Sequence, residues 1–183
     1  EKVNSDIKAA ILQALTVLLS KIPQFLRPFI PQLQRTFVRS LADPTNDKLR
    51  SKAVLALGTL IEFQPRVDSL VTELVSGAKQ ADQAVKTSIL KGILEVVSKA
   101  GKNMSEPSKT SIMTLVEEEI TKVSEKSAVA YARLVGSLSK VLLSEEATNI
   151  LKNKILNTSV QGDFKFSILS INSFLKDAPN HIF

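Results

Sequence analysis

The stretch LRSKAVLALGTL, residues 49–60, decides the fold of this chain, because its pattern returns along the sequence. Apolar and small residues recur every three or four positions, as on one face of a helix, and a cation stands second. Similar stretches read IKAAILQALTVL at 7–18, VKTSILKGILEV at 85–96 and FKFSILSINSFL at 164–175. The cation moves from position 8 to 50, 86 and 165, in steps of 42, 36 and 79 residues. The last step fits two repeats, and the copy between them falls near Ala128, where the apolar rhythm continues without the charge.

A repeat of this length indicates stacked helical hairpins. Periods of about 20–50 residues are typical of solenoids, and a period near forty fits two-helix units of HEAT or armadillo type. We therefore predict an all-α fold, an α-solenoid of about four and a half HEAT-type helical hairpins. The chain begins with Glu1 and with an unpaired second helix, so we expect residues 1–183 to be one segment of a longer solenoid. The predicted units are 3–22 (the lone second helix), 23–64, 65–101, 106–143 and 144–177.

Capping residues and prolines predict where the helices end. Asn4 or Ser5 can cap a helix that runs to about residue 21, and Pro31 fits the first turn of a helix that ends near residue 41. Gly58 is expected to be a point of close packing between helices. Further helices are expected at about 47–63, 67–79, 83–100, 107–122, 124–143, 144–157 and 163–176. The expected apolar faces of the first two helices are Ile7, Ile11, Ala14, Leu15 and Leu18, and Leu33, Phe37 and Leu41.

The composition argues against an enzyme. The chain has no cysteine, which excludes disulfides, a thiol nucleophile and a cysteine zinc site, and which fits a cytoplasmic protein. His181 is the sole histidine, so a histidine pair for a metal has no second member, and a catalytic triad would depend on His181 alone. The six glycines are scattered and form no phosphate-binding loop. We predict no catalysis, no cofactor and no metal, and no apolar run reaches the length of a membrane span.

Positive charge is concentrated in the first part of the chain. The net charge is +6, of which residues 1–52 carry +5, with nine basic and four acidic side chains. A basic surface attracts acidic partners, whether protein, phosphate or nucleic acid. Arg35 and Arg39 are spaced i, i+4 and share a helix face. Lys48, Arg50 and Lys52 lie around the start of the next helix, so a hairpin can bring the two groups to one edge. We predict that these five residues bind a partner.

Arg50 has two readings, which the sequence leaves open. In HEAT hairpins a cation at this position often bonds an aspartate of the preceding turn and forms a ladder along the stack, and Asp43 or Asp47 could accept here. The planar guanidinium also suits a direct contact with a partner's carboxylate. Both roles could hold together.

Three stretches of the sequence resemble a known protein family. Residues 31–43 (PQLQRTFVRSLAD), 49–61 and 66–74 resemble the giant ribosome-associated HEAT-repeat proteins that activate the kinase of initiation factor 2 in the general amino acid control pathway. The likeness is close over about residues 10–75 and looser beyond. It implies that the chain comes from the C-terminal region that binds RWD domains. It also implies two kinds of partner, the RWD domain of the starvation-sensing kinase and competing RWD-domain proteins.

The resemblance further implies that an arginine of this region binds the kinase, and the best-matching motif assigns this role to Arg50. An RWD domain presents an acidic surface, which suits the basic charge around that residue. Arg50→Ala is then predicted to weaken RWD binding with helix content intact. Loss of helix in this variant would instead indicate the ladder role.

Three functional hypotheses follow. The leading one is a non-catalytic adaptor that recruits the kinase through its RWD domain and promotes its activation on ribosomes. The second is binding of ribosomal RNA or tRNA by the basic end. For this the only nearby aromatics are Phe25, Phe29 and Phe37, and we expect no exposed stacking platform. The third is a purely structural spacer within the parent scaffold.

Overall fold

The computed structural model describes residues 4–64, 66–119 and 125–142, together with positions 172 and 176. All regular elements within these residues are helical, which confirms the all-α prediction. The chain divides into two compact units, residues 1–103 and 104–183. The first unit contains α1 (Ser5–Lys21), α2 (Pro23–Leu26), η1 (Arg27–Phe29), α3 (Ile30–Leu41), α4 (Asp47–Ile61), α5 (Asp68–Gln80), α6 (Gln83–Ala100) and η2 (Gly101–Asn103). The second contains α7 (Glu106–Glu119) and α8 (Glu125–Leu142), which pack against each other.

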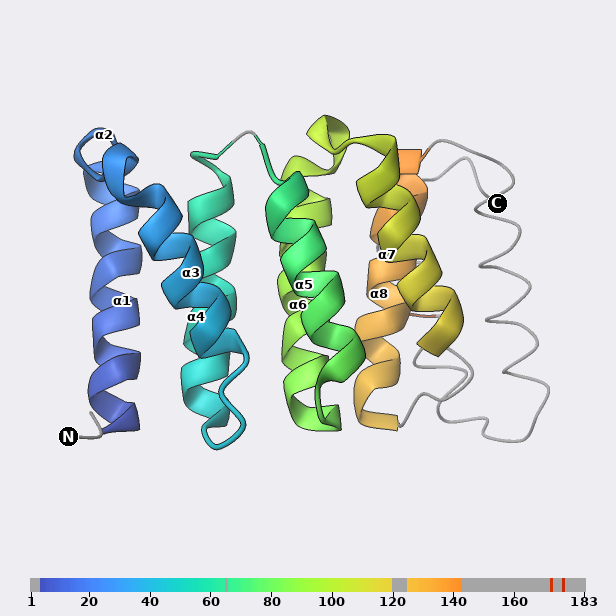
Figure 1. Cartoon of the computed structure of the whole chain (residues 1–183), viewed down its shortest axis with the longest axis horizontal. Helices are drawn as coiled ribbons and strands as arrows, with labels where there is room; N and C mark the ends of the chain where they lie inside the picture. The colour runs from blue at the N-terminus through green and yellow to red at the C-terminus, as the bar shows by residue number, and fades with distance from the viewer. Residues whose placement is uncertain (1–3, 65, 120–124, 143–171, 173–175, 177–183) are drawn as a thin grey trace. The chain divides into compact units, whose positions relative to one another are not determined.

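The helices of the first unit form two layers. In one layer α4 packs against α1 on one side and against α6 on the other. In the second layer α3 packs on α4 and α5 packs on α6, so that α3–α4 and α5–α6 are hairpins (Figure 1). The helix α1 lies in the same layer as α4 and α6. The division into five units stays a prediction, and its last unit, 144–177, lies outside the described residues except for positions 172 and 176.

Local sequence signals account for the helix ends. The side chains of Asn4, Asn46 and Asp82 accept hydrogen bonds from the main-chain N–H groups of Asp6, Leu49 and Val85 at 2.9, 2.8 and 2.9 Å. Such a cap contributes about 1 kcal/mol to helix stability. A proline stands in the first turn of α3, as predicted. The ends of α1 and α3–α8 agree with the predicted ones within about three residues.

The inward face of α3 agrees with its prediction, whereas that of α1 does not. Leu33, Phe37 and Leu41 are buried. In α1 the buried residues are instead Ala9, Leu12 and Leu19. The predicted face is mostly exposed, including Ile7, Ile11 and Leu18. The physical reason is that α1 is apolar around much of its circumference, so its single large neighbour, α4, decides which side is covered.

No single helix among the described residues has the length and apolarity of a membrane span. Only α1 taken together with the segment Pro23–Leu41 would meet those two criteria, and this pair is bent by 117°.

Two polar bridges and two closely packed glycines lie where α6 contacts α4. Near the end of both helices, the Lys99 ammonium donates to the Gly58 carbonyl at 3.0 Å and to a Glu62 carboxylate oxygen at 2.7 Å. A Cβ on Gly58 would lie only 2.5 Å from Glu95 Oε2, which confirms close packing at this glycine. The second bridge, made by Arg50, is described below.

Gly92 allows a close approach in the middle of the same interface. A Cβ there would lie 2.9 Å from Leu41 Cδ2 and 3.4 Å from Leu57 Cδ2. At Gly77 of α5 the nearest atom would be Ile89 Cδ1 at an ordinary 3.6 Å. The interface of α6 with α3 and α4 therefore has little room for an added methyl group.

We expect Gly92→Ala to be less stable than its control Gly77→Ala by about 1–2 kcal/mol, since adding a methylene to a packed core usually costs about 1–3 kcal/mol. Both variants gain helix propensity, about 1 kcal/mol, so their difference isolates the packing effect. Urea unfolding followed by circular dichroism measures this difference. Equal midpoints for the two variants would show that the neighbouring leucines move aside without cost.

Candidate functional site

Four of the five predicted site residues lie near the turn of the α3–α4 hairpin, whereas Arg35 lies in the middle of α3. Arg35 and Arg39 belong to α3, and Lys48, Arg50 and Lys52 belong to the first turns of α4. The short connection of residues 42–46 joins the two helices. We call this region the basic edge.

The members of the basic edge differ in how far they reach solvent. Arg35, Arg39 and Lys48 are exposed, and Lys52 is half-buried. Lys48 forms an ion pair with Asp6 of α1 at 3.3 Å, but both side chains are 69% exposed. Such a surface pair contributes about 0–1 kcal/mol and is easily exchanged for another partner. Arg35, Arg39 and Lys52 form no hydrogen bond or ion pair with the described part of the chain.

Arg50 is the exception, because its side chain is only 6% exposed. Its Nη1 donates to the main-chain oxygen of Asp43 at 2.7 Å, and its Nη2 to the Asp47 carboxylate at 3.2 Å. Its Nε donates to Ser88 Oγ of α6 at 3.2 Å. One guanidinium therefore joins the turn before α4, the first turn of α4 and the next hairpin.

Of the two roles that the sequence left open for Arg50, this geometry fits the ladder role. The bond to an aspartate that the sequence suggested is present with Asp47, and Asp43 accepts through its main chain instead of its side chain. A contribution of Arg50 to partner binding stays a prediction. In this geometry the contribution is indirect, because the residue holds the turn that connects α3 to α4.

The turn itself is built around Asp43. Its Oδ1 accepts hydrogen bonds from Thr45 N at 2.9 Å, from Thr45 Oγ1 at 2.7 Å and from Asn46 N at 3.1 Å. The hydrogen bond from the Thr45 hydroxyl has the largest effect in holding the pKa of the Asp43 carboxyl below its ordinary value. The positive charge of Lys8 adds a smaller effect of the same sign. Asp43 is therefore ionised at neutral pH, and its hydrogen bonds to Thr45 and Asn46 hold the connection between α3 and α4.

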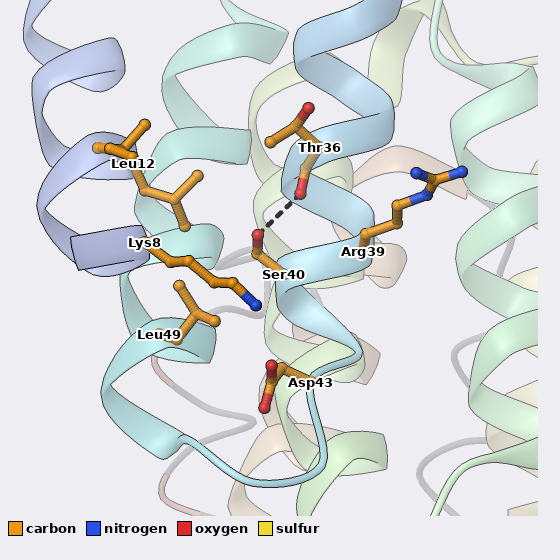
Figure 2. Close-up of a pocket in the computed structure, with 8 residues that line it drawn as sticks. Lys8, Leu12, Thr36, Arg39, Ser40, Asp43 and Leu49 are labelled. Atoms are coloured by element: carbon orange, nitrogen blue, oxygen red, sulfur yellow. Dashed lines mark hydrogen bonds between the residues drawn. The ribbon is translucent and has the colours of Figure 1, made fainter. Parts of the chain in front are cut away.

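A groove lies beside the basic edge, between α1 and α3 (Figure 2). It has a volume of about 370 Å³, and Arg39 and Asp43 line it together with residues that the sequence analysis did not assign to a site. In the sequence, Lys8 is the cation of the repeat copy at 7–18, and it was not assigned to a site. The additional lining residues are Lys8, Ile11, Leu12, Thr36, Ser40 and Leu49.

The exposed side chains of this site are suited to binding a partner. Across the described residues no three acidic or histidine side chains converge where a metal ion could bind. What the edge offers is a set of exposed cations next to a groove with an apolar floor. Such a surface can pair with carboxylates or phosphates and can cover an apolar side chain.

Comparison with known proteins gives consistent relatives. Residues 68–182 match the family model described as "Stalled ribosome sensor GCN1-like, HEAT repeats". This match supports the predicted α-solenoid fold class. No solved structure matches the chain.

Three relatives show how far the similarity extends. The eIF-2-alpha kinase activator GCN1 of Saccharomyces cerevisiae is 63% identical over 185 aligned positions, which cover 100% of this chain. Protein ILITYHIA of Arabidopsis thaliana is 32% identical over 97% of the chain, and the stalled ribosome sensor GCN1 of Homo sapiens is 34% identical over 82%. The chain spans only about 6–7% of the length of these relatives.

Proposed function

Because this chain belongs to the family of GCN1-like HEAT-repeat proteins, we propose that it is a non-catalytic scaffold segment that binds the RWD domain of the starvation-sensing kinase of initiation factor 2. In the parent protein this binding promotes activation of the kinase on ribosomes, in the cytoplasm. Competing RWD-domain proteins use the same surface. The relatives' names, kinase activator and stalled ribosome sensor, support the general role.

The observation that carries the proposal is the pair of exposed, uncompensated arginines on α3. Arg35 and Arg39 share one helix face and form no ion pair within the described residues. An acidic RWD surface would meet them without first displacing an internal partner. Complementary charge of this kind mainly raises the association rate and sets the orientation of the complex.

Within this proposal the other members of the basic edge have distinct roles. Lys48 and Lys52 extend the positive surface along the start of α4. Arg50 keeps the turn and the first turn of α4 in place, so that the exposed cations hold a fixed arrangement. The weakening of RWD binding predicted for Arg50→Ala is then an indirect effect.

The proposal is tested by titrating the 183-residue chain with the purified RWD domain of the kinase. We expect Arg35→Glu/Arg39→Glu to weaken binding about tenfold at low salt, mostly through the association rate, since close charge pairs at interfaces couple by more than about 1 kcal/mol. Raising the salt concentration should reduce the difference. Stopped-flow or surface-plasmon kinetics measure both effects.

The matched control is Arg66→Glu/Lys91→Glu, which changes the net charge equally at two exposed residues away from the basic edge. We expect this control to bind nearly as the unmodified chain does. Equal weakening of RWD binding in the two double variants would show that the effect comes from net charge alone. Absence of any RWD binding to the unmodified chain would refute the proposal.

Nucleic-acid binding is the second candidate, and one structural finding bears on it. Phe25 and Phe29 are 68% and 55% exposed, contrary to the expectation that no aromatic platform is exposed. Phe37 is fully buried, as expected. Phe29 precedes α3, whereas Arg39 lies in its last turn, about 15 Å further along the helix axis. The segment 23–29, which contains both residues, therefore lies at the opposite end of α3 from the turn 42–46 (Figure 1).

A competition experiment separates the two candidates. Ribosomal RNA or tRNA is added to the preformed complex of the chain and the RWD domain. An adaptor keeps its RWD domain at physiological salt, whereas a nucleic-acid module releases it and binds the RNA through the same arginines.

A further inference from the structure

The groove between α1 and α3 has an apolar floor that belongs to the core. Both helices pack against α4, and Leu12 of α1 and Leu49 of α4 line the space between them. Leu12 and Leu49 are 2% and 1% exposed. Ile11 lines the same space from α1 but is 49% exposed, so it is a large apolar side chain at the mouth of the groove.

The wall formed by α3 is less polar than its residues suggest. The hydroxyl of Thr36 donates to the Gln32 carbonyl at 2.9 Å, and that of Ser40 donates to the Thr36 carbonyl at 2.9 Å (Figure 2). Both donors are thus used within the helix. Ligand sites are mostly apolar with a few placed polar groups, and a volume of about 370 Å³ lies in their usual range.

Lys8 places a positive charge in the groove. Its ammonium points across the groove toward Ser40 and Asp43, whereas the Arg39 guanidinium points to the other side of α3 (Figure 2). Lys8 forms no hydrogen bond or ion pair with the described part of the chain. Asp43, the one acid of the lining, accepts three hydrogen bonds from its own turn on Oδ1 and forms no ion pair with Lys8. The cation is therefore available to a carboxylate that comes from outside.

We propose that this groove receives a large apolar side chain from an acidic segment of the RWD domain, while a neighbouring carboxylate of that segment pairs with Lys8. The charge of the surroundings selects an acidic occupant, since residues 1–52 carry a net charge of +5. The groove adjoins the basic edge through Arg39 and Asp43, which belong to its lining. This inference rests on the proposed function and adds to it a second anchoring point, with Lys8 and Ile11 as its specificity residues.

The test uses two variants of the 183-residue chain, titrated with the kinase's RWD domain by calorimetry. Ile11→Glu places a charge in the mouth of the groove, and Thr36→Trp fills the groove without changing the charge. We expect each to weaken binding about tenfold, the usual effect of losing a central apolar anchor. Thermal unfolding of each variant checks that the fold is retained.

The matched control is Val17→Glu. Val17 is 53% exposed, lies on the same helix and does not line the groove, so it tests the added charge and the lost apolar surface alone. We expect its affinity to stay within about twofold of the unmodified chain, as for residues outside the energetic centre of an interface.

The outcomes separate the groove from the wider function. If Ile11→Glu and Thr36→Trp bind normally while Arg35→Glu/Arg39→Glu is weakened, the groove proposal is overturned and the adaptor function stands. If the unmodified chain binds no RWD domain, both are overturned. If Ile11→Glu lowers affinity for ribosomal RNA but not for the RWD domain, the occupant is not an acidic protein segment.

Discussion

Replacing Arg50 with alanine is expected to lower the free energy of unfolding of the first unit by about 2–4 kcal/mol. Hydrogen bonds from a charged donor contribute about 1.5–3 kcal/mol each, and buried acceptors that lose their donor are not rehydrated. The bond to Ser88 is buried and counts fully, whereas the bond to the Asp43 carbonyl is part-buried and counts less. The pair with Asp47 adds less, because the side chain of Asp47 is 85% exposed.

Two further variants make the Arg50 experiment decisive. Arg50→Lys keeps the charge but loses the planar fork, so it should fall between the unmodified chain and alanine. Arg39→Ala removes an exposed arginine and should shift stability by no more than about 0.5 kcal/mol. Urea unfolding measured by circular dichroism ranks the three. If Arg50→Ala unfolds like the unmodified chain but loses RWD binding, Arg50 contacts the partner directly.

Phe37→Ala is expected to have the largest effect on stability, about 3–5 kcal/mol, the usual cost of removing a buried phenylalanine side chain. Phe37 has no exposed surface and lies between Leu33 and Leu41 on the inward face of α3. Because α3 carries Arg35 and Arg39, the loss of this anchor also loosens the helix that presents the basic edge. Thermal unfolding should show a much lower transition temperature for the first unit.

The control for Phe37→Ala is Phe25→Ala, the same substitution at a residue that is 68% exposed. It should change stability by no more than about 0.5 kcal/mol. Similar losses in the two variants would contradict the assignment of Phe37 to the core. Loss of RNA binding in Phe25→Ala, at unchanged stability, would give the exposed rings a function.

The helices could be predicted from the sequence because their signals are local. Caps such as Asn46 and Asp82 lie a few residues from the groups that they bond. The inward face of α3 was also predictable, since Leu33, Phe37 and Leu41 recur every four residues on a helix whose other positions are mostly polar. The face of α1 was not, because that helix offers apolar residues on several sides and its neighbour α4 selects among them.

The site could be predicted only in part, for the same reason. Spacing alone places Arg35 and Arg39 on one face and puts Arg50 near the turn. The burial of the Arg50 side chain depends on α6, which packs on α4 and brings Ser88 to it. Ser88 lies 38 residues further along the chain. The groove combines residues of α1, α3 and α4, so no single stretch of sequence contains a pattern for it.

The two bridges between α4 and α6 have a mechanical consequence. One bridge, from Arg50 to Ser88, joins the beginnings of these helices, and the other, from Lys99 to Gly58 and Glu62, joins their ends. A force that slides one helix along the other must stretch both attachments at the same time. Sliding of the α3–α4 hairpin along the α5–α6 hairpin is therefore opposed at both ends of their contact.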